Sequence, residues 1–477
     1  MHWYDMAVYF PSEVLLGFVV FAAMIGFGTP LASGQDDVQV TEVDPGSVFP
    51  EAMVTTTPPI DLPGHEKGKR TRPPEPAVPP LEEPAVSEWF GGDPWPTWSR
   101  ATGDWAGART RLEDSGISIN GSLILDWSSV LDGGIQQRSA TRHLLDVNFT
   151  FDLETIFGVQ GATVFADFYS QAGPNASNDA GDFQGFSNID LDDDVDQLAE
   201  LWYEQWLFEN AIRIKIGKVD ANSEFAFVEA AANFINSSPG VTPTILGLPT
   251  YPDPATSVNV FAYPTEHLYL GFGFYDGAQA VDGVATGRRG PRTFFDGDLS
   301  DDYFLIGEGG FTWDTLAGWG PGRFAVGGWH HTGKFETFGG ATDDGTEGLY
   351  VLLETRLGSP PPGGQAQEQG VSVFIQYGYA DESVSDVKYH VAVGLSAVGA
   401  FPGREHDIAG AYVSYVDLSD ANGAGLGDHE TVLELFYKFQ ITPFISVQPD
   451  LQIVVNPSGR DDIDDAVIGA LRLELTF

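Results

Sequence analysis

Cysteine and positive charge are scarce in this 477-residue sequence. Cysteine is absent, and 23 Lys and Arg residues stand against 68 Asp and Glu residues, which gives a formal net charge of -45. Without cysteine the chain has no disulfides and no thiolate metal sites. The excess of negative charge makes nucleic acid an unfavourable partner. It suggests exposed acidic loops that attract cations, although general solubility is the simpler explanation of the acidity.

Long apolar segments are also scarce, and a mean hydropathy of -0.09 argues against a bundle of membrane-spanning helices. Residues 14–27 form the one long apolar run. Its length suits the core of a signal peptide, and the small residues 31–34 suit cleavage near Gly34. The sequence therefore predicts a signal peptide over residues 1–34. Because the segment before the run has no Lys or Arg, a single anchor helix is the alternative.

Residues 35–96 are rich in proline and poor in residues that form a core. Such a segment cannot bury enough apolar surface to offset the entropy of ordering. Prolines within residues 73–80 favour a stiff, extended spacer. We therefore predict a disordered periplasmic linker over residues 35–96. A basic cluster at residues 65–72 could contact the cell wall or anionic lipid, with a solvated charge run as the alternative.

Apolar and polar residues alternate along many segments after residue 97. In the last segment, Leu471, Leu473 and Leu475 share one face of a strand, and Arg472 and Glu474 share the other. A membrane barrel turns the apolar face to lipid and the polar face to a wet lumen. A soluble sandwich, the alternative, would bury the apolar face against a second sheet.

The number and length of these segments predict the architecture. The 57 glycines and an aromatic content of 13% are typical of a barrel or sandwich. Most segments have about eight to eleven residues, which is enough for a tilted strand to cross a bilayer. We predict an all-β fold, a transmembrane antiparallel β-barrel of about 16 strands over residues 97–477, with short periplasmic turns and long external loops. The predicted strands begin near Ile117, His143, Gly161, Leu198, Ala211, Thr256, His267, Tyr303, Arg323, Leu349, Val371, Lys388, Asp407, Glu430, Phe444 and Ala466.

Five motifs follow one another along the predicted barrel. Residues 103–112 read Gly-Asp-Trp-Ala-Gly-Ala-Arg-Thr-Arg-Leu, a predicted helical turn before the first strand, and the others lie at residues 217–225, 234–238, 248–255 and 448–457. In this order they resemble the carbohydrate-selective porins of the OprB type, whose ordered region opens with a similar Gly-Asp-Trp-x-Gly-x-Arg-x-x-Leu pattern.

That resemblance implies passive diffusion of monosaccharides or small oligosaccharides through a barrel surrounded by lipid of the bacterial outer membrane. Pattern and length alone predict a pore and not its substrate. A less selective, cation-preferring channel and a plugged structural or adhesive barrel are therefore the alternatives. The sequence is also compatible with an oligomer.

We predict that the protein is not an enzyme and uses no cofactor or metal. The sequence has no nucleotide-binding loop and no convincing nucleophile motif, and His330-His331 is not followed by a zinc-protease pattern. Barrel hydrolases exist, however, and His143, His267 and His390 keep a hydrolase as an alternative.

A sugar pore needs polar groups for hydroxyls and aromatic faces for the apolar side of the sugar ring. One predicted strand places Glu200, Trp202, Glu204 and Trp206 on one face. We predict that this face lines the lumen; the alternative puts both tryptophans in the aromatic belt at the lipid interface. Cations on the next strand would add a transverse field across the pore. These cations are Arg213 and Lys215. Seven further charged residues are candidates for the lumen, and each of them could equally form a structural salt bridge on the barrel wall. They are Arg142, Asp146, Asp167, Glu354, Arg356, Glu434 and Lys438.

Two connections are longer than a turn requires. Residues 220–257 contain an alanine-rich stretch, 224–234, for which we predict a helix. We predict that this connection folds into the barrel mouth and narrows it, with packing on the outer rim as the alternative. The acidic run at residues 190–196 could bind calcium, but it lacks the glycine and the terminal glutamate of an EF-hand loop, which favours a solvated charge run.

Overall fold

The structure is a computed structural model that describes residues 94–477, apart from 279, 282–283, 298, 301 and 359–368. The predicted signal peptide and residues 35–93 of the predicted linker lie outside the described residues, so both stay predictions. Within the described part, no helix is both long enough and apolar enough to cross a membrane.

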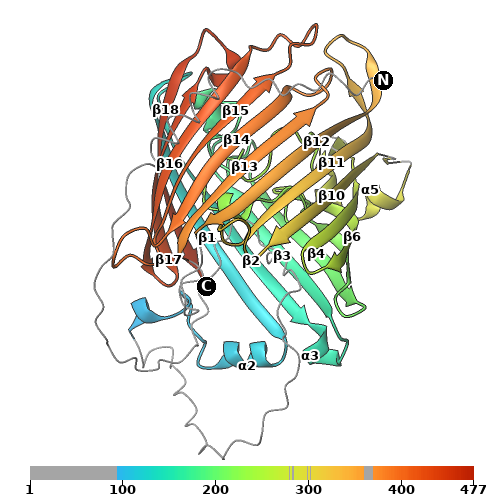
Figure 1. Cartoon of the computed structure of the whole chain (residues 1–477), viewed down its shortest axis with the longest axis vertical. Coiled ribbons are helices and arrows are strands. Elements are labelled where there is room, and N and C mark those ends of the chain that lie inside the picture. Colours follow the sequence, from blue (N-terminus) through green and yellow to red (C-terminus); the bar gives the residue numbers. More distant parts are fainter. Residues whose placement is uncertain (1–93, 279, 282–283, 298, 301, 359–368) are drawn as a thin grey trace, which may run out of the picture. The chain divides into compact units, whose positions relative to one another are not determined.

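Sixteen strands form a closed antiparallel barrel (Figure 1). Adjacent strands pair in chain order, β7 pairs with β10, and β1 closes the barrel against β18. The predicted fold class and strand number are confirmed. The barrel strands are β1 Ile117–Gly134, β2 Ser139–Asp152, β3 Ala162–Ala172, β4 Val195–Leu207, β5 Ile212–Val219, β6 Ala255–Thr265, β7 Leu268–Asp276, β10 Tyr303–Trp313, β11 Gly322–Glu336, β12 Thr342–Leu357, β13 Gly370–Ala380, β14 Val387–Val398, β15 Ile408–Leu418, β16 His429–Thr442, β17 Ile445–Val455 and β18 Asp464–Thr476.

The remaining elements precede β1 or lie in the connections between barrel strands. Two of them, β8 and β9, pair only with each other in the connection between β7 and β10. The bounds are η1 Trp95–Thr97, α2 Ala108–Asp114, α3 Leu153–Phe157, α4 Ser177–Ala180, η2 Glu229–Ala231, β8 Ala280–Val281, β9 Val284–Ala285, η3 Thr286–Arg289, α5 Arg292–Phe295 and η4 Pro457–Gly459.

Several strands are longer than predicted. β1 has 18 residues and β12 has 16, so the expectation of about eight to eleven is wrong for them. The first residues of β12 include Asp343, Asp344 and Glu347, which pair with β11 beyond the apolar part of the barrel. Because this part of the hairpin lies in water, its residues need not alternate between apolar and polar. An alternation pattern therefore misses it.

The outer face of the barrel is apolar and its inner face is polar. On β18, Leu471 and Leu473 are 43% and 36% exposed, whereas Arg472 and Glu474 are 4% and 6% exposed. A soluble sandwich would show the reverse. The barrel therefore turns its apolar side chains to lipid. Further exposed apolar side chains of the wall are Leu125, Trp127, Leu201, Ile216, Leu270, Phe272, Phe311, Phe324, Ile375, Leu435 and Leu451.

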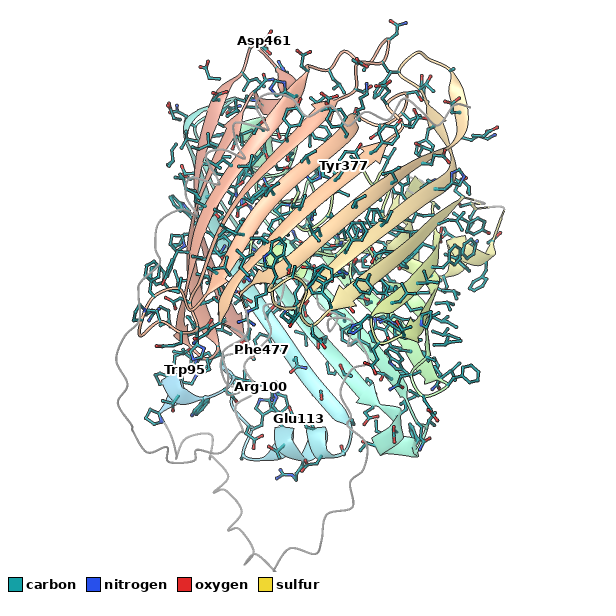
Figure 2. The ribbon with its side chains drawn as sticks, viewed as in Figure 1. Trp95, Arg100, Glu113, Tyr377, Asp461 and Phe477 are labelled. Carbon is teal, nitrogen blue, oxygen red and sulfur yellow. The ribbon has the colours of Figure 1, made fainter. Side chains whose placement is uncertain are left out.

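Phe477 closes the seam between the first and the last strand. Its backbone N–H donates to the carbonyl of Gly121 at 2.8 Å, and the Gly121 N–H donates back at 2.9 Å. A Cβ at position 121 would lie 2.5 Å from the Phe477 ring, so glycine allows the ring to lie over β1. Figure 2 shows Phe477 and Asp461 at opposite ends of the barrel. We name these the terminal end and the loop end; short turns mark the terminal end as periplasmic.

The Gly-Asp-Trp motif builds the terminal end of the barrel. The Asp104 carboxylate accepts hydrogen bonds from the backbone N–H and the hydroxyl of Thr110, at 2.9 and 2.7 Å. Buried Arg109 donates from Nη2 to the carbonyl of Ile119 on β1 at 2.7 Å. The predicted helical turn is confirmed as α2, and these contacts tie it to the first strand.

Candidate functional site

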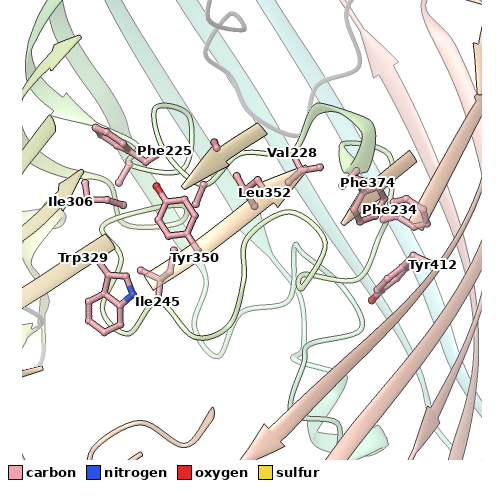
Figure 3. Close-up of a cluster of buried hydrophobic side chains, with 14 of the residues drawn as sticks. Phe225, Val228, Phe234, Ile245, Ile306, Trp329, Tyr350, Leu352, Phe374 and Tyr412 are labelled. Carbon is pink, nitrogen blue, oxygen red and sulfur yellow. The ribbon is translucent and has the colours of Figure 1, made fainter. Parts of the chain in front are cut away.

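The connection between β5 and β6, residues 220–254, folds into the barrel, and we name it the lumen loop. Its Phe234 is 2% exposed and packs edge-on against Phe374, Tyr412 and Phe436, with ring centroids 4.9–5.8 Å apart (Figure 3). These three rings belong to β13, β15 and β16, which lie across the closed barrel from β5. The lumen loop therefore crosses the interior, and the alternative of a loop packed on the outer rim is wrong.

Carboxylates of the inner wall hold the lumen loop by its backbone. Glu434 accepts hydrogen bonds from the N–H groups of Ile235 and Asn236, at 2.7 and 3.1 Å. Each carboxyl oxygen of Glu434 thus accepts one backbone N–H of the lumen loop. Glu354 and Glu434, predicted to line the lumen, thus anchor the loop. The other pairs are Glu308 with the N–H of Ala226 at 3.0 Å and Glu354 with the N–H of Ala230 at 3.1 Å.

The same bonds explain why the helix predicted over residues 224–234 is wrong. The segment contains one 3₁₀ turn, η2, and is otherwise irregular. An α-helix directs each N–H to the carbonyl four residues earlier. Here the wall carboxylates accept from the N–H groups of Ala226 and Ala230. Tertiary contacts therefore override the helix propensity of the alanines.

Two buried cations of β5 point into the barrel beside the base of the lumen loop. Arg213 and Lys215 lie 3.5 and 3.6 Å from Oε2 of Glu204, next to the β4 acids as predicted. Both pair more closely with Glu224 of the lumen loop, which lies 2.5 Å from Lys215 Nζ. Burial opposes ionisation of Glu224, but the charges of Arg213 and Lys215 outweigh it and lower the pKa of this carboxyl. The sequence analysis missed Glu224 because it assigned this residue to a helix.

Trp202 and Trp206 both lie on the inner face and not at the lipid interface. Buried Trp202 stacks on Phe165, with centroids 4.9 Å apart. Trp206 stacks on Tyr263 at 5.4 Å and donates from Nε1 to Glu204 at 3.0 Å. Trp206 and Glu204 keep part of their surface exposed. We name Trp206, Tyr263 and Glu204 the aromatic patch. It lies close to the terminal end of the barrel, near the last residues of β4 and β6.

Three of the predicted acids come together on adjacent strands but are covered. Asp146, Asp167 and Glu200 of β2, β3 and β4 are fully buried. The N–H of Asp220 donates to Glu200 Oε2 at 3.2 Å, so the start of the lumen loop lies against these acids. Solute contact with them stays a prediction, and it would require the loop to move.

The remaining predicted charges mostly form pairs on the wall. Arg142 is buried and pairs with Asp190, which lies in the connection between β3 and β4. Lys438 donates to Glu474 of β18 at 2.6 Å. Arg356, near the terminal end of β12, is half-buried. The structural alternative, a salt bridge on the barrel wall, thus describes Lys438, whereas Arg142 joins the wall to a connection.

The connection between β3 and β4, residues 173–194, was predicted as one of the long external loops, but it folds inward, and we name it the mouth loop. Its buried Phe186 offers a carbonyl to Gln452 Nε2 at 2.8 Å. It also meets the lumen loop, because the N–H of Asn188 donates to the carbonyl of Ile235 at 2.7 Å. Apolar residues within a polar loop, Phe186 among them, were the available signal.

The acidic run at residues 190–196 overlaps the mouth loop, and two of its carboxylates have partners there or on the wall. Asp190 pairs with Arg142, and Asp192 accepts from Asn175 at 2.9 Å. Burial raises the pKa of Asp190 to about 6, against the opposing effect of Arg142. Within the described residues, no group of three or more His, Cys, Asp or Glu side chains could hold a metal ion.

A closed barrel with an apolar wall toward lipid, a polar inner wall rich in Asp, Glu, Arg and Lys, and loops folded into its lumen defines an outer-membrane porin. The family model described as "Carbohydrate-selective porin, OprB family" matches residues 136–477. The chain belongs to this family. It is therefore a porin of the bacterial outer membrane that provides passive, carbohydrate-selective diffusion.

The alignments with similar proteins extend over most of the chain. It is 22% identical to "Porin B" of Pseudomonas aeruginosa over 79% of this chain and 90% of that protein. It is 21% identical to "Putative porin QuiX" of Acinetobacter baylyi over 79% of this chain and 92% of that protein. The solved "High pH structure of Pseudomonas putida OprB" superposes with a TM-score of 0.69 at 20% identity, covering 80% of this chain and 99% of that one. This likeness shows the same barrel fold.

Proposed function

We propose that sugars pass the lumen along the aromatic patch, on the terminal side of the lumen loop. Trp206 and Tyr263 offer aromatic faces to the apolar side of a sugar ring. Glu204 offers carboxyl oxygens as acceptors to sugar hydroxyls. The observation that carries the proposal is the exposed surface that Trp206 and Glu204 keep on the inner wall.

The lumen loop sets the size limit of this path. It crosses the interior from β5 to the β13–β16 wall, so a solute must pass beside it. Its position depends on the contacts of Glu434 and Glu354 with its backbone and on those of Arg213 and Lys215 with Glu224.

The proposal assigns no catalytic step to the barrel. His390 is buried, and its two ring nitrogens lie 2.9 Å from the hydroxyls of Thr242 and Ser414. One nitrogen thus contacts the lumen loop, and the other contacts Ser414 of the neighbouring strand β15. His143 and His267 lie apart near opposite ends of the barrel wall, on β2 and beside β7, so no shared hydrolytic site supports the alternative. The predicted oligomer and the predicted cell-wall contact of the linker stay predictions.

A cation-preferring channel remains the second candidate because of the net charge. The inner wall argues against a strong preference where its acids pair with cations. Arg472 makes a bidentate contact with Asp126, at 2.9 and 2.8 Å, and Lys438 pairs with Glu474. A reversal potential close to zero in a salt gradient is expected for such a wall.

Liposome swelling with Trp206→Ala tests the patch. Glucose is compared with gluconate, an anion of similar size, and we expect the glucose-to-gluconate rate ratio to fall about fivefold, as for the loss of one favourable aromatic contact. Trp127→Ala is the matched control, because Trp127 is an exposed, lipid-facing tryptophan on β1. An unchanged ratio for Trp206→Ala would contradict the proposal.

A further inference from the structure

A cavity of about 470 Å³ lies at the loop end of the barrel, away from the aromatic patch. The mouth loop, the lumen loop and the connection between β17 and β18 all contribute to its walls. Its volume lies in the range of small-molecule sites. Polar side chains that line it include Asn175, Ser177, Asp182, Asp192, Ser237 and Ser458.

Asp182 is the unusual residue of this cavity. It is 9% exposed, and neither oxygen of its carboxyl group has a hydrogen-bond partner among the described residues. The hydroxyl of Ser177, which lines the same cavity, lies close enough to this carboxyl group to lower its pKa, but the two groups make no well-formed hydrogen bond. Buried polar groups normally make such bonds. These two groups, which lie close together on one cavity wall, are therefore suited to hold a polar ligand.

The cavity is held in shape by Glu430 of β16. This carboxylate accepts from the N–H groups of Phe183 and Gln184 of the mouth loop at 2.7 and 3.0 Å, and from the N–H of Ser458 at 2.6 Å. One wall residue thus joins two loops next to Asp182. A site whose loops are fixed before binding loses less entropy when a ligand enters.

Paired charges around the cavity favour a neutral ligand over a cation, although the Asp192 carboxylate has Asn175 and not a cation as its partner. Asp190 is neutralised by Arg142, and Arg460 pairs with Asp462 at 2.7 Å. Burial and the nearby charge of Glu430 raise the pKa of Asp182, which favours the protonated form of its carboxyl group. In that form it both donates and accepts a hydrogen bond, as a sugar hydroxyl does.

We propose that this cavity is an entry site that binds one neutral sugar at the outer mouth, before the sugar reaches the aromatic patch. Asp182 and Ser177 hold sugar hydroxyls, and Phe183 offers an apolar side chain to the ring. The inference rests on the sugar selectivity of the family and is separate from the role proposed for Trp206.

Glucose binding to the full chain in detergent, followed by saturation-transfer NMR, tests the entry site. We expect Trp206→Ala to leave measurable glucose binding, and Asp182→Ala in that background to weaken the remaining binding about fivefold, as for one lost hydrogen bond. Asp182→Asn should retain most of the affinity, because an amide keeps both a donor and an acceptor. Unchanged migration of each barrel on unheated gels verifies folding.

Each outcome separates the two sites. Loss of all glucose binding on Trp206→Ala alone would overturn the entry site and support the aromatic patch. No effect of Trp206→Ala together with loss on Asp182→Ala would support the entry site and contradict the patch. Equal losses for Asp182→Ala and Asp182→Asn would show that the site recognises a charge, which would also overturn the proposal.

Discussion

Acids on two sides of the inner wall have different partners. On the far side, which is formed by β12–β16 opposite β5, Glu434 and Glu354 accept hydrogen bonds from backbone N–H groups of the lumen loop. On the near side, which is formed by β4 and β5, Glu204 contacts side chains, among them Trp206, and keeps part of its surface exposed. An inward-facing carboxylate is therefore not by itself a solute contact. Some of these acids position the loop that shapes the pore, and one remains available beside an aromatic face.

Removal of the lumen loop should have the largest effect. Deletion of residues 230–249 removes Phe234 and the segment that reaches the far wall, so we expect single-channel conductance to rise about twofold or more. Deletion of residues 316–319, in the turn between β10 and β11, is the control because Leu316 and Trp319 there are exposed. Equal conductance of the loop deletion and the wild type would show that the lumen loop does not limit the path.

Glu224→Gln should have the next largest effect, because it leaves Arg213 and Lys215 buried with Glu204 alone. Removing one partner of a buried ion pair costs about 3–5 kcal/mol. Since the pKa of Glu224 is lowered in the folded state, its contribution is present at neutral pH and is lost as pH falls below the ordinary range of a carboxyl. Urea unfolding at several pH values should therefore show a gap between wild type and variant that closes in acid.

The control for that variant is Glu113→Gln. Glu113 pairs with Arg100 at 2.7 Å at a partly exposed position outside the lumen. Exposed pairs contribute about 0–1 kcal/mol, so this change should have little effect at any pH. A gap for Glu224→Gln that widens in acid would contradict the assigned direction of its pKa.

The strands of the barrel could be predicted because alternation is a local signal. The predicted starts at Ile117 and Tyr303 coincide with those of β1 and β10. The start predicted at Leu349 for β12 is late, because β12 begins at Thr342 with polar residues outside the lipid. Wherever lipid contacts one face, the sequence carries the period of the strand, and it loses that period where water contacts both faces.

The inner partners could not be predicted in the same way. Ile235 and Glu434 are 199 positions apart, and no local pattern joins them. The sequence placed Glu200, Trp202, Glu204 and Trp206 on one face by parity, and the structure has them on that inner face. Parity does not show that the lumen loop then covers Glu200 and leaves Glu204 partly exposed. That difference depends on how a connection folds back into the barrel, which short-range periodicity does not record.

Glu434→Gln should have the smallest effect, and it tests whether the acids opposite β5 anchor the lumen loop. A glutamine oxygen can still accept from the N–H of Ile235, but its NH₂ group faces the N–H of Asn236, so one buried donor loses its acceptor. Such a loss costs about 1–3 kcal/mol. The variant should expose the lumen loop to protease without changing the strands, whereas Glu347→Gln, at a side chain 79% exposed on β12, should not. If both variants resist protease equally, the far-wall acids do not hold the loop, and the distinction between anchoring and solute-binding carboxylates would be wrong.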